Sequence, residues 1–463
     1  MTIHKLPGGW SPAGAFRHAA KQPYPFFLDG AGGPEKYTNH SFIGSDPFLV
    51  VHAKGYECRI DYPREGRREE KHIHPFDLMK ELFTKYCVEE RGAFPMACGG
   101  AVGYLAYDLF PLIENVEQHA VDDINMPDLF FTFHDVVVAF DNRTGEASLA
   151  VKEGAPKEVV DHWLAPPPPE RAPTFEPLDI KVEDLIANET PEEYRDAVER
   201  AREYIAKGDV YQVNLSRRFT IKGYELDPIE LYLKFREASP APFGACLFPD
   251  NFAVLSNSPE RYLLIDGDYI ETRPIKGTRP RGRDPEEDAL LAKELKDSVK
   301  DSAEHIMIVD LERNDLGRVS SYNSVHVPDL AVLESYANVH HIVSTVAGRI
   351  HPSRDLVDCI RNSFPGGSIT GAPKVRALSI IDELEPTARG AYCGSIGYID
   401  FSGRVDLNIA IRTAIMKGDT IHFQVGGGIV IDSDPEEEFE ETITKAQSFI
   451  KAVTGKGRVW GEQ

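Results

Sequence analysis

Acidic side chains with the spacing of a reaction site lie in the second half of the chain. Glu304 follows Asp301 by three residues in "KDSAEHIMIVDL", and Glu441 follows Glu438 by three in "DPEEEFEETITK". Residues three apart share one face of a helix. Two such pairs could hold a hard cation such as Mg²⁺, which prefers carboxylate and water oxygens. Alternatively, both pairs are solvated helix faces, because acids are also favoured near helix N-termini.

A basic stretch, "ETRPIKGTRPRGR" from Glu271 to Arg283, stands out in a chain whose formal net charge is -23. It holds four arginines and one lysine, Lys276, between Ile275 and Gly277. So acidic a protein repels nucleic-acid phosphates, and it must build a local basic pocket if it binds an anion. The stretch is a candidate for that pocket. Lys276 is either a nucleophile, which must lose its proton to attack, or a solvated turn lysine.

Two glycine-rich segments, "FPGGSITGAPKVRA" and "FQVGGGIVI", would let backbone N–H groups approach an anion, although each is also an ordinary turn sequence. The first is not a phosphate loop, because Ala372 follows Gly371. Arg412 lies in the apolar run "NIAIRTAIM", where a buried guanidinium needs a carboxylate or phosphate partner. His341 in "VHHIVST" is, by itself, best explained as a core histidine. Together these residues predict a small carboxylated substrate bridged to Mg²⁺.

Both strands and helices are predicted to position these residues. "DLFFTFHDVVVAFD" and "EASLAVKE" in the first half, and "CGSIGYIDFSG", "VDLNIAIRTAIMKG" and "TIHFQVGGGIVI" near the end, are typical of strands. Thr190, Pro191 and Glu193 form a capping box that starts a helix, and Gly208 ends it. Asp434 caps a closing helix. The predicted fold class is therefore α+β, with strands dominant and helices around them.

A proline-rich segment, "LAPPPPERAPTFEPLDIKVED", divides the chain, because consecutive prolines exclude helix and central strand. We expect an N-terminal region over 1–163, a connector over 164–188 and a catalytic region over 189–455, with both regions packed into one sandwich. The proline run could also be a ligand for another protein. Scattered cysteines without a CxxC pair, and the lack of a signal peptide or membrane-length apolar run, suit a reducing cytoplasm.

The longer motifs identify the chain as resembling the chorismate-utilising enzymes. "SPERYLL", "TRPIKGTRPRG", "DSAEHIMIVDLERNDLGRV", "FPGGSITGAPKVRALSIIDELEP", "RGAYCGSIGYI" and "GGGIVIDSDPEEEFEET" occur in the order typical of that family, most strongly from about Tyr194 to Ile450. The resemblance implies a fold like that of anthranilate synthase component I, a two-sheet β-sandwich flanked by helices. It also implies chorismate as substrate and Mg²⁺ as cofactor.

Two positions indicate the branch of that family. Members that add water to chorismate carry a lysine base where this chain has Gln212, so the resemblance is to the ammonia-using branch. Anthranilate synthase large subunits usually read "PIAGT", whereas Lys276 gives "PIKGT", as in aminodeoxychorismate synthases of 4-aminobenzoate and folate synthesis. There the lysine is a covalent nucleophile, and the residue matching Glu260 protonates the departing hydroxyl. These roles require a lowered pKa for Lys276, from nearby positive charge, and a raised pKa for Glu260.

The resemblance assigns further roles position by position. Glu304 and Glu441 match the Mg²⁺ ligands, and Glu438 and Asp301 match water-mediated partners of the ion. The positions that match substrate-binding residues are Arg412 and Tyr392 at the enolpyruvyl carboxylate, Gly426, Gly428 and Lys445 at the ring carboxylate, and Gln212, Gly277, Thr278, His341 and Ser368 along the pocket. No glutaminase nucleophile motif is recognisable, so a separate glutamine amidotransferase (glutaminase) partner is expected to supply ammonia.

Two other functions stay open. An anthranilate synthase large subunit would also eliminate pyruvate. A non-catalytic amino-acid-binding regulatory subunit would not need Glu260, Lys276, Glu304 and Glu441 together. In feedback-inhibited anthranilate synthases a Leu-Leu-Glu-Ser run marks a tryptophan pocket, and the corresponding "FFLDG" here lacks the Glu-Ser pair. Feedback by tryptophan is therefore not expected, and a purely structural tryptophan site stays open.

Overall fold

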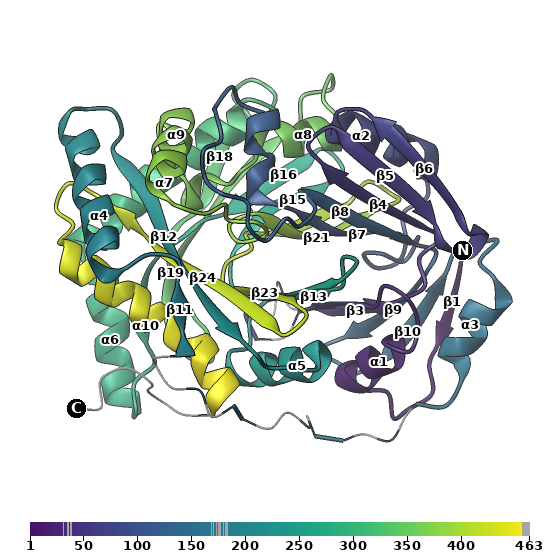
Figure 1. The fold of residues 1–463 in the computed structure, drawn as a ribbon. Helices are drawn as coiled ribbons and strands as arrows, with labels where there is room; N and C mark the ends of the chain where they lie inside the picture. Colours follow the sequence, from purple (N-terminus) through teal and green to yellow (C-terminus); the bar gives the residue numbers. More distant parts are fainter. Residues whose placement is uncertain are drawn as a thin grey trace.

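The computed structural model describes residues 1–455 except 31, 35, 36, 38, 168, 170, 173, 175, 176, 179 and 181–183. The connector expected over 164–188 lies partly outside the described residues. Within them, two antiparallel sheets of twelve strands each pack together, with helices on the outside (Figure 1). The predicted α+β class and two-sheet sandwich are confirmed.

Strands from both halves of the chain build each sheet. In spatial order the first sheet contains β1 (Thr2–Lys5), β10 (Ala147–Val151), β9 (Val136–Asp141), β3 (His40–Gly44), β2 (Phe26–Asp29), β13 (Phe243–Leu247), β14 (Phe252–Ser258), β23 (Thr413–Lys417), β24 (Thr420–Ile429), β12 (Gln212–Lys222) and β11 (Ile186–Ala187), with β20 (Gly371–Ala372) beside β12. The second contains β17 (Ile275–Pro280), β19 (Val339–Arg349), β16 (Tyr269–Arg273), β15 (Arg261–Asp266), β22 (Val405–Asn408), β21 (Ser395–Asp400), β7 (Gly100–Leu105), β8 (Leu129–His134), β4 (Leu49–Lys54), β5 (Glu57–Tyr62) and β6 (Arg67–His72), with β18 (His326–Ser335) beside β19.

Most of the α-helices begin at a side-chain cap, whereas α3 (Lys157–Leu164) and α9 (Lys374–Leu384) begin without one. Thr190 and Glu193 form the predicted capping box, and the Asp434 side chain accepts from two N–H groups of the closing helix. The α-helices are α1 (Pro12–Ala19), α2 (Pro75–Tyr86), α3 (Lys157–Leu164), α4 (Pro191–Ala206), α5 (Pro228–Ala238), α6 (Pro285–Asp297), α7 (Val299–Gly317), α8 (Leu356–Ser363), α9 (Lys374–Leu384) and α10 (Pro435–Thr454), with short 3₁₀ turns η1 (Pro63–Glu65), η2 (Tyr107–Leu112) and η4 (Gly367–Ile369). In the described part of the chain, no helix combines the length and the apolar character needed to cross a membrane.

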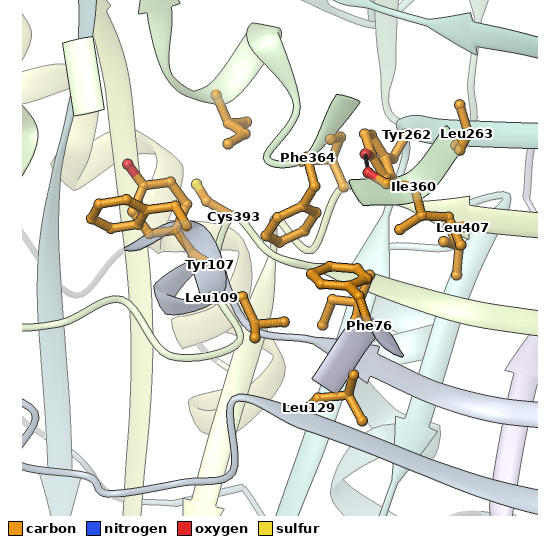
Figure 2. Close-up of a cluster of buried hydrophobic side chains, with 14 of the residues drawn as sticks. Phe76, Tyr107, Leu109, Leu129, Tyr262, Leu263, Ile360, Phe364, Cys393 and Leu407 are labelled. Atoms are coloured by element: carbon orange, nitrogen blue, oxygen red, sulfur yellow. Dashed lines mark hydrogen bonds between the residues drawn. The ribbon is translucent and has the colours of Figure 1, made fainter. Parts of the chain in front are cut away.

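Both faces of each sheet are covered, because successive side chains of a strand point to opposite faces. In β2, Phe26 and Leu28 join the apolar layer between the sheets, whereas Phe27 packs under α1 with its ring 5.3 Å from that of Phe16. On the other side of the molecule, Tyr262 of β15 packs with residues of α2, α8 and β22 in the cluster of Figure 2. These buried layers hold the strands that carry the site.

Candidate active site

A β-bulge sets the direction of Lys276. The pairing of β17 with β19 shifts register between Lys276 and Thr278, and Gly277 between them has a φ of +77°. Bulges re-aim side chains, and this positive φ suits glycine. The Lys276 Nζ lies 3.6 Å from Oε2 of Glu304 on α7, with only 17% of the lysine side chain exposed. The lysine therefore points inward and is not a solvated turn residue.

Glu260 is a buried carboxyl group beside that lysine. It lies between β14 and β15 and is 4% exposed. The Ser368 hydroxyl donates a hydrogen bond to its Oε1 at 2.6 Å. Burial raises the pKa of Glu260 to about 7, although Ser368, the Ile275 N–H and the Lys276 charge act to lower it. At neutral pH the group is therefore able to hold and release a proton, as a general acid must.

Gln212 and Gly428 enclose the same space from β12 and β24. The Gln212 side chain is fully buried, and neither its amide oxygen nor its amide nitrogen has a hydrogen-bond partner among the described residues. A Cβ atom on Gly428 would lie 2.6 Å from Gln212 Nε2 and 2.8 Å from Lys276 Nζ. Only glycine therefore lets the amide and the lysine meet at this strand. Unpaired buried amides are rare in folded proteins and are available here to a ligand.

The C-terminal helix brings its acids to the neighbouring glycine. A Cβ atom on Gly427 would lie 3.1 Å from Glu438 Oε2 and 3.6 Å from Glu441 Oε1. Lys445 Nζ is 2.5 Å from Glu441 Oε1 and donates to the carbonyl of Gly426 at 2.7 Å. Lys445 lowers the pKa of Glu441, whereas burial raises the pKa of Glu438.

The predicted metal ligands approach one another without forming a closed cation site. Among the described residues, no three His, Cys, Asp or Glu side chains lie close enough together to hold a metal ion. Asp301 is instead 3.3 Å from Arg279. Lys276 is close to Glu304, and its charge also contributes to lowering the pKa of Glu441. These carboxylates have the oxygen donors that suit Mg²⁺, and lysine ammonium groups supply the positive charge beside them.

Arg412 and Tyr392 are the residues that the resemblance assigns to the enolpyruvyl carboxylate, and His341 is one that it places along the pocket. Arg412 has a φ of +50°, and no ion pair to a carboxylate is found for it in the described part of the chain. The Cys393 N–H bonds to the carbonyl of Ala410 at 2.9 Å, which brings the Tyr392 segment beside the one leading to Arg412. Burial and the Arg412 charge lower the pKa of His341 to about 3. A neutral histidine and an unpaired guanidinium therefore lie in one region.

His341 also contacts the bulge that aims the lysine. Its Nδ1 is 3.0 Å from the Thr278 hydroxyl, and its Nε2 is buried without a hydrogen-bond partner among the described residues. The histidine is thus buried, as its sequence suggested, and it also keeps a free ring nitrogen.

The expectation that the whole basic stretch forms an anion pocket is wrong. Its four arginines pair with carboxylates: Arg273 with Glu334 at 2.7 Å, Arg279 with Glu294 at 3.0 Å, Arg281 with Asp288 at 2.7 Å and Arg283 with Glu287 at 3.0 Å. Glu334 of β18 is distant in the sequence, and the other three acids lie on α6. Composition alone could therefore not reveal these ion pairs. Lys276 is the basic residue of the stretch that reaches the site.

Sequence reasoning missed a buried arginine that supports the pocket. Arg389 is 2% exposed, pairs with Glu385 at 2.6 Å and donates to the carbonyls of Asn214 and Ile369 at 2.7 and 3.2 Å. It thereby ties β12, next to Gln212, to the turn that holds Ser368. The sequence signal for this buried arginine was a charged residue at the start of the otherwise uncharged segment "RGAYCG".

A cavity of about 290 Å³ lies between the two sheets, and none of the site residues described above lines it. It is lined by Leu28, Asp29 and Gly30 of the "FFLDG" stretch, together with His40 and Arg261. The "FFLDG" stretch, which corresponds to the tryptophan-pocket segment of feedback-inhibited relatives, therefore borders a cavity.

Comparison with known proteins agrees with this geometry. The family model described as "chorismate binding enzyme" matches residues 26–451. The chain belongs to the chorismate binding enzyme family. It is 43% identical to "Aminodeoxychorismate synthase component 1" of Salmonella typhimurium over 453 residues, covering 97% of each chain. It is also 40% identical to "Anthranilate synthase component 1" of Aquifex aeolicus over 447 residues, covering 94% of this chain and 90% of the relative.

Solved structures of this family share the fold. Anthranilate synthase component I from Streptococcus pneumoniae superposes with a TM-score of 0.77 at 31% identity, over 89% of this chain and 92% of the other. The isochorismate synthase MenF from Escherichia coli gives a TM-score of 0.71 at 16% identity, over 98% and 94% of the two chains, which shows the fold alone. The chain is thus a chorismate-utilising enzyme, and relatives of comparable identity carry two different names.

Proposed function

We propose that this chain is the large subunit of an aminodeoxychorismate synthase, which converts chorismate and ammonia into 4-amino-4-deoxychorismate for 4-aminobenzoate and folate synthesis. The observation that carries the proposal is the inward position of Lys276, beside Glu260 and against the Gln212 amide at Gly428. The relatives alone do not choose between this activity and anthranilate synthase, because both names occur at about 40% identity. A lysine that points into the pocket has a role in the aminodeoxychorismate synthase reaction, where it acts as the nucleophile.

In the first chemical step the neutral Lys276 amine attacks ring carbon C2 of chorismate. The ring double bonds shift, the C4–oxygen bond breaks, and Glu260 gives its proton to the departing hydroxyl, which leaves as water. Burial, which raises the pKa of Glu260 to about 7, supports this acid role. The attacking nitrogen gives up one proton to solvent water, so atoms and charge balance. The lysine is then bonded to C2 as a secondary amine.

In the second step ammonia attacks C4 and the bond between C2 and Lys276 breaks. The Glu260 carboxylate accepts a proton from the incoming nitrogen, which restores the acid, and the leaving lysine nitrogen regains from solvent water the proton that it gave up in the first step. The enolpyruvyl group stays on the ring. Gln212 has no proton-accepting amine, which supports attack by ammonia rather than by activated water.

The substrate's two carboxylates would be held at opposite sides of the pocket. Arg412, with its unpaired guanidinium, would bind the enolpyruvyl carboxylate, and Tyr392 would pack beside it. A Mg²⁺ ion held by Glu304 and Glu441, with Glu438 and Asp301 around it, would neutralise the ring carboxylate. Lys445 and the N–H groups near Gly426 would complete that cradle.

Ammonia would come from a separate glutamine amidotransferase subunit, as the resemblance implies. The experiment that tests the proposed function is mass analysis of the products made from chorismate, Mg²⁺ and ammonium salt. Aminodeoxychorismate is the expected product. Anthranilate with pyruvate would assign the chain to anthranilate synthase, and no turnover would favour the regulatory-subunit alternative.

A further inference from the structure

Glu312 is a buried acid that the reaction outlined above does not use. It lies on α7, about two helical turns beyond Glu304, and is 4% exposed. Its Oε1 accepts a hydrogen bond from the main-chain N–H of Ser368 at 3.1 Å. The hydroxyl of the same serine donates to Glu260 at 2.6 Å. Ser368 therefore connects Glu312 to the acid of the proposed reaction.

The turn η4 can reach Glu312 only because of a glycine. A Cβ atom on Gly367 would lie 3.0 Å from Glu312 Oε1 and 2.7 Å from Leu311 Cδ2. Real Cβ contacts are rarely this short, so any other residue at this position would push the turn away from α7. The close approach brings the Ser368 N–H within reach of the carboxyl group.

A second buried contact fixes the ends of the same loop. Lys374 Nζ is 2.5 Å from Asp315 Oδ2, and it donates to the carbonyls of Ser363 and Pro365 at 2.8 and 2.7 Å. The loop from 363 to 374 is thus anchored to α7 at both flanks. In the middle of the loop, the Ser368 carbonyl accepts from the Asn214 side-chain amide at 3.3 Å, whereas the Ser368 N–H, on the other side of the residue's backbone, donates to Glu312.

The surroundings keep Glu312 protonated near neutral pH. The titratable groups that face it are Asp315 of α7, Lys374 at the start of α9, Glu260 before β15 and Tyr262 on β15. Burial, with Asp315 and Glu260, raises the pKa of Glu312 to about 8, while Lys374 acts to lower it. A neutral carboxyl group accepts through its carbonyl oxygen, and a glutamine side chain reproduces that acceptor.

We propose that Glu312 is a positioning residue for Glu260: it fixes the backbone of Ser368 so that the serine hydroxyl stays directed at the acid. The inference rests on the acid role of Glu260 in the proposed function. Because Glu312 acts through Ser368, removing it should reproduce the loss of the serine hydroxyl. It should not change the chemistry of Lys276 directly.

The first test is Glu312→Met, which keeps the length of the side chain and removes the acceptor. We expect kcat to fall about tenfold with KM for chorismate within about twofold. Without the serine donor the pKa of Glu260 rises, so the alkaline limb of the pH profile moves to higher pH. Glu312→Gln should recover most of the rate. Asp310→Asn, on the exposed side of the same helix, is the matched control.

The decisive comparison is a double-mutant cycle with Ser368→Ala. If Glu312 acts through the serine, Glu312→Met adds little to the loss in a Ser368→Ala background. Independent, additive losses, or a Glu312→Met variant with the parental rate and pH profile, would overturn the inference. If Glu312→Met does not fold, Gly367→Ala serves instead. It separates the turn from an intact Glu312 and should shift the pH limb in the same direction, and an unshifted limb would overturn the inference.

Infrared titration of the carboxyl bands separates this inference from the proposed function. Glu260→Gln assigns the Glu260 band in the substrate-free protein, with no turnover needed. Ser368→Ala and Glu312→Met should both raise the pKa read from that band. If the parent fails to make aminodeoxychorismate but the band shifts, the proposed function falls and the positioning role stands. An unshifted band in Glu312→Met overturns the positioning role alone.

Discussion

The hydroxyl of Ser368 donates a 2.6 Å hydrogen bond to Oε1 of Glu260, joining residues 108 positions apart. Both side chains are less than 10% exposed. The bond directs one carboxyl oxygen of Glu260 toward η4, and the charge of Lys276 acts to lower the pKa of Glu260. A serine that the resemblance placed only along the pocket is thus in direct contact with the acid of the proposed reaction.

Loss of this hydroxyl should slow the reaction and make the acid weaker. In Ser368→Ala, Glu260 loses a donor that stabilises its carboxylate form, so its pKa rises and the alkaline limb moves to higher pH. We expect kcat to fall about tenfold because the acid is less well oriented. Steady-state kinetics across pH checks this, with Ser379→Ala as control, since that hydroxyl donates to the Val375 carbonyl within α9. If Ser368→Ala keeps the parental rate and the parental alkaline limb of the pH profile, the hydrogen bond between Ser368 and Glu260 is not important for the reaction.

The rate should depend on a protonated Glu260. Burial raises its pKa from an ordinary value of 4.5 to about 7, so the acid form is complete well below pH 7 and is lost as pH rises through it. At a fixed concentration of free ammonia, kcat/KM for chorismate should therefore fall above about pH 7. Glu260→Gln should lose about a thousandfold in kcat with KM little changed. If the Glu260→Gln variant keeps the parental fall in kcat/KM with rising pH, a group other than Glu260 causes that fall.

Lys276 should be indispensable and should carry the covalent bond. Lys276→Ala removes the nucleophile, and Lys276→Arg keeps a charge that cannot be deprotonated, so both should lose at least about a thousandfold in rate. Mass spectrometry of protein quenched during turnover should show an adduct on the peptide that contains Lys276. Lys293→Ala, on exposed α6, should behave as the parent. Substantial turnover by Lys276→Ala would exclude covalent catalysis through this residue.

Magnesium should bind through the acids of α7 and α10. Mg²⁺ should raise the melting temperature of the parent, and Glu304→Gln or Glu441→Gln should weaken that effect at least about tenfold in metal concentration. Chelation should abolish turnover, and added Mg²⁺ should restore it. Glu437→Gln, at the first turn of α10, is the control. Equal melting shifts in the parent and both ligand variants would place the ion elsewhere.

Local sequence signals predicted the elements well. The Thr190 capping box and the Asp434 cap start helices where expected, because a cap depends on residues three positions apart. The segment from 284 to 317 forms two helices, α6 and α7, with Ser298 at their junction.

Contacts between distant segments were beyond sequence reasoning. The ion pairs that neutralise the arginines near Lys276 depend on where β18 and α6 pack. The bulge at Gly277 depends on how β17 pairs with β19, a strand more than sixty residues away. The site residues themselves were predicted through long motifs, whereas the partners of Ser368 could be found only in three dimensions.

The most direct test of the account is the product of the purified chain. Incubated with chorismate, Mg²⁺ and an ammonium salt, the parent should yield 4-amino-4-deoxychorismate by mass, without release of pyruvate. Lys276→Ala, analysed in parallel, should yield none. Anthranilate and pyruvate from the parent would contradict the account and assign the chain to anthranilate synthesis.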